Sequence, residues 1–201
     1  MANGEARLVA VMVAIDAANA CDPTTIAVDG RQEPSELVFG RRMSETLDRL
    51  APDASQHARI AARGFHVERW TIPRKSFPEG RAGYLNWRNT LKAFHANRIA
   101  GIMTVAGYDA GDIARVGALV RKERLKRDAE AQLLEDVACV VFLQHYLEDF
   151  RLKTDEDKLA EILAKTWRKM SEHGHDHALK LDLGPTIPLL LQRGLARLAS
   201  S

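Results

Sequence analysis

The chain has 201 residues, of which 46% are hydrophobic and 28% charged, and its formal net charge is +2. This length fits one domain, or at most two small ones, and suffices to bury a core without disulfides or a metal. The small net charge argues against an extended basic track for nucleic acid, and no apolar stretch approaches the ~20 residues that a membrane span needs.

The first predicted element is a helix over residues 8–20. Ala18-Asn19-Ala20 imitates a signal-peptide cleavage site, but Asp16 interrupts the short apolar run before it. We therefore expect a helix of the folded domain here. With only Cys21 and Cys139 in the chain, a disulfide framework is not expected and the reducing cytoplasm is the expected location.

Apolar residues recur at three- and four-residue spacing almost throughout, and no alternating strand of useful length stands out. The predicted helices span residues 8–20, 35–50, 55–65, 82–106, 109–122, 128–150, 155–172 and 185–198. The predicted helix starts and stops are N-caps at Ser35, Ser55, Asp109, Asp128 and Thr154, and terminating glycines at Gly107 and Gly174. This pattern predicts an all-α fold, a single compact helical bundle over residues 1–201.

Residues 61–95 carry the most unusual chemistry. Five arginines and two lysines share this segment with two histidines, two of the three tryptophans, one tyrosine and only two acidic residues. Arg59, Arg63 and His66 fall at helical spacing on one face, and Tyr84, Arg88 and His95 form a second stripe. Between them, residues 71–80 form a loop that is long for a helical domain and contains two prolines.

Two interpretations of this segment stay open. Arginine beside aromatic residues and histidine is typical of a site for a phosphorylated or carboxylated ligand, here between two helices and closed by the loop. Alternatively, the segment is a solvated basic face whose tryptophans belong to the core. Under the first interpretation, the predicted ligand-binding residues are Arg63, Arg69, Trp70, Arg74, Arg81, Tyr84, Arg88 and Lys122.

Two acids stand on the otherwise apolar helix 128–150. Glu135 and Asp136 have apolar neighbours at helical spacing, and a buried carboxylate is costly unless it meets a cation, a metal or several donors. A structural ion pair and a ligand or metal role therefore remain alternatives. His173, His175 and His177 would align only on a strand, so we expect a helix end and a polar turn there.

Several segments resemble one family over about residues 15–181. They are FGRRMSETLDRL, HVERWTIPR, GRAGYLNWR, FHANRI, LLEDVACVVFL and KTWRKMSEHGH, and they resemble the domain of unknown function 4202 family. The resemblance implies little about activity.

The order of features is also similar, more distantly, to the HD superfamily of metal-dependent phosphohydrolases. This resemblance implies an HD-domain-like bundle in which His66 and Asp136 are metal ligands and His95 is an accessory one. Val67, however, stands where the family has aspartate, and arginine or lysine occupies two further histidine positions, at 41–42 and 121–122. A divalent ion usually needs three or more protein ligands, so the ligand set is incomplete and a metal cofactor stays open.

Three functions follow from these features. The first is a phosphohydrolase-like enzyme for a small phosphorylated metabolite or nucleotide, with His66, His95, Asp136 and Glu135 as catalytic residues. The second is a binding module that holds an anionic ligand or partner without turnover. The third, RNA association through arginine and aromatic side chains, is disfavoured by the near-neutral charge. The oligomeric state, a homo-oligomer included, is open.

Overall fold

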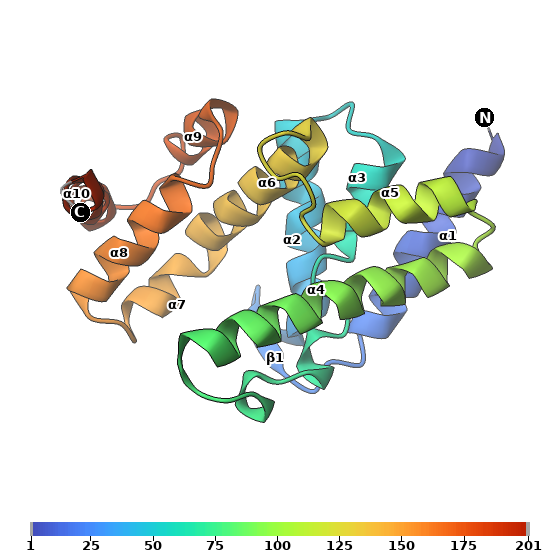
Figure 1. The fold of residues 1–201 in the computed structure, drawn as a ribbon, viewed down its shortest axis with the longest axis horizontal. Coiled ribbons are helices and arrows are strands. Elements are labelled where there is room, and N and C mark those ends of the chain that lie inside the picture. Colours follow the sequence, from blue (N-terminus) through green and yellow to red (C-terminus); the bar gives the residue numbers. More distant parts are fainter. Residues whose placement is uncertain (1, 200–201) are drawn as a thin grey trace. The chain divides into compact units, whose positions relative to one another are not determined.

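The computed structural model describes residues 2–199 and is all-α apart from one β-hairpin in that range (Figure 1). The chain divides into two compact units, Met1–Ala131 and Gln132–Ser201, and each is described by itself. The boundary falls inside helix α6 (Ala129–His145). Whether the units form the single domain expected from the sequence stays a prediction.

The first unit is a group of helices around one core. Its elements are α1 (Ala2–Asn19), β1 (Thr25–Val28), β2 (Arg31–Pro34), α2 (Ser35–Leu50), α3 (Gln56–Arg63), α4 (Gly80–Val105) and α5 (Ala110–Val120). Helix α1 packs against α2, α3 and α4, while α3 also contacts α2 and α5. Helices α4 and α5 lie side by side (Figure 1).

Fully buried side chains from all five helices form the core of the first unit. They include Val11, Ile15, Met43, Leu47, Ile60, Ile99, Met103, Val116 and Leu119. Their three- and four-residue spacing is the periodicity that predicted the helices. Burial of these large apolar side chains stabilises the scaffold by roughly 1.5–3 kcal/mol each.

The β-hairpin was not expected from the sequence. The two strands are antiparallel, with Thr25 opposite Pro34 and Val28 opposite Arg31. The turn Asp29-Gly30 has φ values of 48° and 78°, which a two-residue hairpin turn requires and which Asp-Gly favours. Strands of four residues are too short for alternation to stand out, but the Asp-Gly pair was an available signal.

The second unit contains α6, α7 (Leu147–Arg151), α8 (Glu156–Trp167), α9 (Glu172–Ala178) and α10 (Thr186–Ala199). Helix α8 packs against α10, which is seen end-on in Figure 1. A Cβ at Gly194 of α10 would lie 2.1 Å from the Ala160 carbonyl oxygen of α8, so this close approach requires glycine. The predicted helices 128–150 and 155–172 are each interrupted, at Tyr146 and after Trp167 respectively.

The predicted helix ends are partly correct. Side-chain caps are confirmed at Ser55, Asp109 and Asp128, and Gly107 terminates α4 with φ 78°. Three expectations are wrong. The N-cap position of α2 is Pro34 rather than Ser35, and that of α8 is Asp155 rather than Thr154. Gly174, expected to terminate a helix, lies inside α9. At α2 the reason is tertiary, because Asp22 accepts the Glu36 N–H from outside the helix.

No helix within the described residues is both long and apolar enough to cross a membrane. Cys21 is exposed and Cys139 is buried, and neither forms a disulfide.

Candidate functional site

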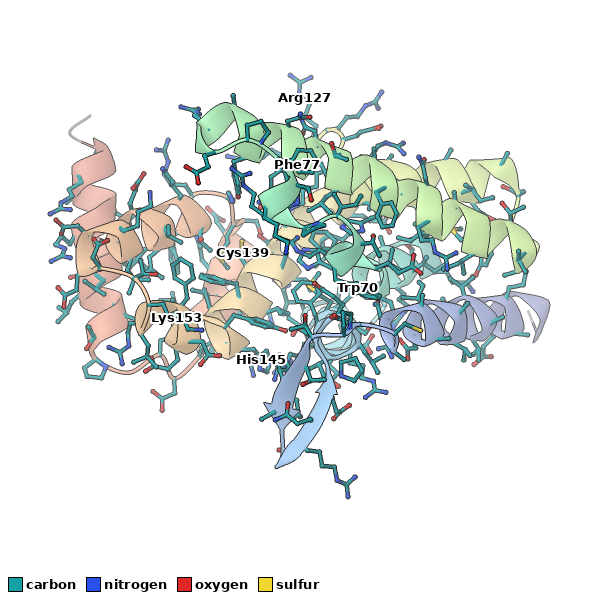
Figure 2. All side chains as sticks on the ribbon, turned by 90° about the horizontal axis from the view of Figure 1, so that it is seen from below. Trp70, Phe77, Arg127, Cys139, His145 and Lys153 are labelled. Carbon is teal, nitrogen blue, oxygen red and sulfur yellow. The ribbon has the colours of Figure 1, made fainter. Side chains whose placement is uncertain are left out.

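A pocket of about 220 Å³ lies at the N-terminal end of α2, wholly within the first unit. Its walls come from the hairpin region, the first turn of α2, the segment between α3 and α4, and α4 itself. The lining residues are Asp22, Thr24, Ser35, Glu36, Arg69, Trp70, Ile72, Pro73, Arg74 and Trp87. Figure 2 labels Trp70, which belongs to the segment between α3 and α4.

That segment, predicted as a loop over residues 71–80, contains two 3₁₀ turns, Arg69–Thr71 and Arg74–Ser76. The Trp87 indole N–H donates to the Ile72 carbonyl at 2.9 Å and so ties the segment to α4. A Cβ at Gly83 would lie 1.9 Å from the Pro78 carbonyl oxygen, which means that the loop passes directly over the glycine of α4. The pocket wall is therefore fixed to a helix at two points.

Asp22 fixes the opposite wall. One carboxylate oxygen accepts the Thr24 N–H at 2.9 Å, and the other accepts the Glu36 N–H at 3.0 Å. Both bonds are to backbone, and Asp22 is buried. Asp22 thus caps the N-terminal end of α2 and holds the Glu36 backbone beside the pocket.

Arg69 is the central cation of the pocket. Its guanidinium carbon lies 4.8 Å from the Trp87 ring centroid, in cation–π geometry. Nη1 is 3.2 Å from His66 Nε2, and Nε is 3.9 Å from Glu36 Oε1. The ion pair with Glu36 is therefore long, at the limit of a direct contact.

Glu36 has an altered acidity. Its side chain is only 15% exposed, and burial raises the pKa of the carboxyl to about 7, against the opposing effect of Arg69. Asp22 adds a smaller effect in the same direction as burial. Near neutral pH the Glu36 carboxyl therefore exists in both protonation states.

His66 is neutral. Burial, together with the positive charges of Arg69, Lys122 and Arg88, holds the pKa of its imidazole well below the ordinary value. An arginine can only donate, so Nε2 accepts from Arg69 and Nδ1 carries the proton. Nδ1 lies 3.5 Å from Glu36 Oε2, and the ring stacks on Phe39 with centroids 4.1 Å apart.

His95 is a buried neutral acceptor beside His66. The two ring centroids are 6.0 Å apart, and burial lowers the pKa of His95 to about 3. Nδ1 donates to the Val67 carbonyl at 2.8 Å, which leaves Nε2 unprotonated. Nε2 is buried and has no hydrogen-bond partner among residues 2–199.

The other predicted ligand-binding residues do not line the pocket. Arg63 donates two hydrogen bonds of 2.6 Å to Asp16. Helix α3 ends at Arg63, so the prediction that His66 lies on the same helix face as Arg59 and Arg63 is wrong. The remaining positions are Arg88, which contacts the Tyr84 hydroxyl at 3.1 Å, Lys122, whose Nζ is 4.9 Å from the Phe65 ring centroid, and Arg81, which is exposed. Of the predicted set, Arg69, Trp70 and Arg74 meet at the pocket.

The predicted acidic residues belong to the second unit. Asp136 accepts from the Ser171 N–H at 2.8 Å, the Ser171 hydroxyl at 2.5 Å and the Gln132 amide at 3.0 Å. Several donors thus compensate its burial and tie α6 to the start of α9. Glu135, also buried, lies 4.0 Å from Lys169 Nζ. The catalytic roles of both acids stay predictions.

The metal hypothesis gains no support from residues 2–199. No group of three or more histidine, cysteine, aspartate or glutamate side chains is placed there to hold an ion. The predicted ligands His66 and His95 lie in the first unit and Asp136 in the second. His173, His175 and His177 lie on helix α9 rather than in a turn.

Glu36 and Asp22 are the two acidic pocket residues that the sequence analysis did not predict. Asp29-Gly30 between TIAV and RQEP predicts a hairpin, and a hairpin brings residue 22 beside the start of the helix at residue 35. That inference would have placed two carboxyls beside the arginines of residues 61–95.

The chain matches the family model described as Domain of unknown function (DUF4202) over residues 9–190. The comparisons with curated proteins and with solved structures gave no match. The match covers most of the chain and includes the whole pocket segment. The chain belongs to the DUF4202 family.

Proposed function

We propose that the first unit binds a small anionic ligand, carboxylated or phosphorylated, in the pocket at the start of α2. The observation that carries the proposal is the placement of Arg69. It lines the pocket on the face of Trp87, and its nearest carboxylate is 3.9 Å away and titrates near pH 7. A planar guanidinium held by stacking is well suited to grip a carboxylate or phosphoryl group.

Arg74 supplies a second guanidinium. Its Nη1 donates to the Phe77 carbonyl at 2.9 Å, which orients the side chain and leaves its other N–H groups for a ligand. Asp22, the second carboxyl of the lining, accepts one backbone N–H group at each oxygen. Protonation of Glu36 removes the negative charge that lies beside Arg69, so we expect anion affinity to rise as the pH falls through 7.

The size of the pocket restricts the ligand. A volume of about 220 Å³ is below the roughly 300–1,000 Å³ of sites that enclose drug-sized molecules. The pocket suits a phosphoryl or carboxyl group with a short attached chain. Trp70, Trp87 and Ile72 provide the apolar surface for that chain.

Tryptophan fluorescence can test this proposal. Trp70 and Trp87 line the pocket, and Trp167→Phe removes the third tryptophan, which belongs to the second unit. Sulfate is a suitable probe because it has the shape of a phosphoryl group and keeps its charge between pH 6 and 8. The titration is run at pH 6 with chloride at equal ionic strength as the blank.

The expected result is a saturable change that Arg69→Gln weakens about tenfold or more, since hydrogen bonds to charged groups contribute about 1.5–3 kcal/mol. Arg81→Gln is the matched control, because Arg81 belongs to the same sequence segment, is exposed and does not line the pocket. Equal weakening by the two variants, or no saturation, would contradict the proposal.

A second candidate is hydrolysis of a small phosphate ester, in line with the HD-like resemblance. The observation that favours it is the Glu36 pKa of about 7, which leaves a proton donor in the pocket at neutral pH. Water would add to phosphorus and release one proton to solvent while the ester P–O bond breaks. The leaving oxygen would take the Glu36 proton, which solvent then restores.

Glu36→Gln separates binding from turnover. Glutamine keeps the size of the side chain but has no acidic proton, so hydrolysis should fall while sulfate still binds. Candidate esters are tested with wild type and variant by release of inorganic phosphate. Unchanged turnover in the variant would remove Glu36 as the acid.

A further inference from the structure

The connection between α5 and α6 has an unusual backbone. Lys122, Arg124 and Lys126 have φ values of 59°, 54° and 71°, while Glu123 and Leu125 between them have negative φ. Left-handed backbone is uncommon for residues other than glycine, asparagine and aspartate. Three such residues in five positions, all basic, are a strained arrangement of the kind that accumulates at ligand clamps.

The alternation leaves three successive N–H groups without a partner. The N–H groups of Lys122 and Glu123 donate to Leu119 and Ala118 and so end α5. After the loop, the Arg127 and Asp128 N–H groups both donate to the Arg124 carbonyl, at 2.8 and 3.0 Å. In the part of the chain that the structure describes, no group accepts from the N–H of Arg124, Leu125 or Lys126.

Backbone that alternates in the sign of φ turns successive N–H groups toward one side. The resulting concavity, called a nest, binds anions through those N–H groups. The start of α6 is not the feature in question, because Asp128 caps it by accepting the N–H groups of Glu130 and Ala131. Asp128 is also paired with Arg115.

Charge reinforces the nest. Residues 121–127 read RKERLKR, with five basic residues and one acid. The acid, Glu123, is paired with Arg121 at 2.7 Å. Arg124, Lys126 and Arg127 are exposed and form no ion pair within residues 2–199. Figure 2 shows Arg127 with its side chain directed away from the ribbon.

We propose that the nest formed by the N–H groups of Arg124, Leu125 and Lys126 binds the terminal phosphoryl group of a small phosphorylated molecule. Three N–H donors and three exposed cations match a tetrahedral dianion better than a carboxylate, which has fewer acceptor oxygens and a single charge. This site shares no residue with the pocket at α2, so the inference goes beyond the proposed function.

The test is an amide NMR titration of the ¹⁵N-labelled full chain with inorganic phosphate, with sodium chloride at equal ionic strength as the blank. The expected result is a saturable shift concentrated at the amides of residues 124–126. Dimethyl phosphate, a singly charged diester that resembles a nucleic-acid linkage, should shift them only at about tenfold higher concentration. Stronger binding of the diester would overturn the assignment to a terminal phosphoryl group.

Two substitutions at one position separate backbone from charge. Arg124→Gly removes the charge but favours positive φ, so the shifts should persist with affinity reduced several-fold. Arg124→Val removes the same charge but disfavours positive φ, so the shifts at residues 124–126 should be lost. Equal binding by the two variants would overturn the proposal.

If Arg124→Val fails to fold by circular dichroism, the wild-type titration still decides, because shifts spread evenly over the basic surface contradict a nest. Arg69→Gln should leave the shifts at residues 124–126 unchanged. With that variant, loss of phosphate binding at the nest can be distinguished from loss of anion binding in the pocket at α2.

Discussion

Replacing Glu36 with glutamine should stabilise the protein more at pH 8 than at pH 5. Burial raises the Glu36 pKa from 4.5 in the unfolded chain to about 7, so the native state binds more protons across that interval and wild-type stability falls as the pH rises through it. The pKa difference corresponds to about 3 kcal/mol of stability lost at high pH, and most of that loss occurs between pH 5 and pH 8. Glutamine does not titrate, so the Glu36→Gln variant does not lose this stability as the pH rises.

The assay is urea unfolding of wild type and Glu36→Gln at pH 5 and pH 8. The useful quantity is the difference in unfolding free energy between variant and wild type at pH 8, minus the same difference at pH 5. Pairing and packing effects that do not depend on pH cancel in that quantity. A value near zero would refute the inference that Glu36 is a buried carboxyl with a raised pKa.

Three further predictions concern the scaffold. His95→Asn keeps a donor for the Val67 carbonyl but has no imidazole that titrates. Because the His95 pKa of about 3 lies below the ordinary value of 6.5, the wild-type protein loses stability as the pH falls through that interval. Acid unfolding of the variant should therefore start at a lower pH than that of the wild type. Arg63→Ala breaks the partly buried pair with Asp16 and should cost about 1–3 kcal/mol in urea unfolding, with sulfate binding at pH 6 retained in the folded protein. Gly194→Ala places a Cβ against the Ala160 carbonyl and should lower stability by about 1–3 kcal/mol in thermal unfolding, whereas Gly101→Ala, in open space on α4, should not. A wild-type acid profile in the first variant, or unchanged stability in either of the others, would contradict the corresponding contact.

The helices could be predicted from the sequence because their cores follow a simple period. Residues 35–50 match α2 at both ends, and Ser55, Asp109 and Asp128 cap helices as their side chains suggest. Local sequence signals did not predict the helix ends that depend on tertiary contacts. Asp22, distant in sequence, closes the start of α2, and Gly174 lies inside α9 because its missing Cβ admits Asp136, whose Cγ would be 2.7 Å away.

Only the arginine and tryptophan side of the pocket could be predicted from the sequence. The concentration of arginine and tryptophan identified Arg69, Trp70 and Arg74, since those residue types are unusual together on a solvated face. Glu36, an acid in the first turn of α2, could not be predicted, because the sequence does not show how deeply its side chain is buried. Arg63 looked like part of the same basic group, but Asp16, 47 positions earlier, pairs with it.

We propose that Arg69 and Glu36 belong to an anion-binding pocket whose affinity depends on the protonation of Glu36. The most direct measurement is sulfate affinity, by tryptophan fluorescence in the Trp167→Phe background, at several values between pH 6 and pH 8. We predict that affinity rises as the pH falls through 7, that Glu36→Gln binds tightly at every pH, and that Arg69→Gln binds weakly at every pH. Affinity that does not depend on pH in the parent protein, or that is unchanged by Arg69→Gln, would contradict the account.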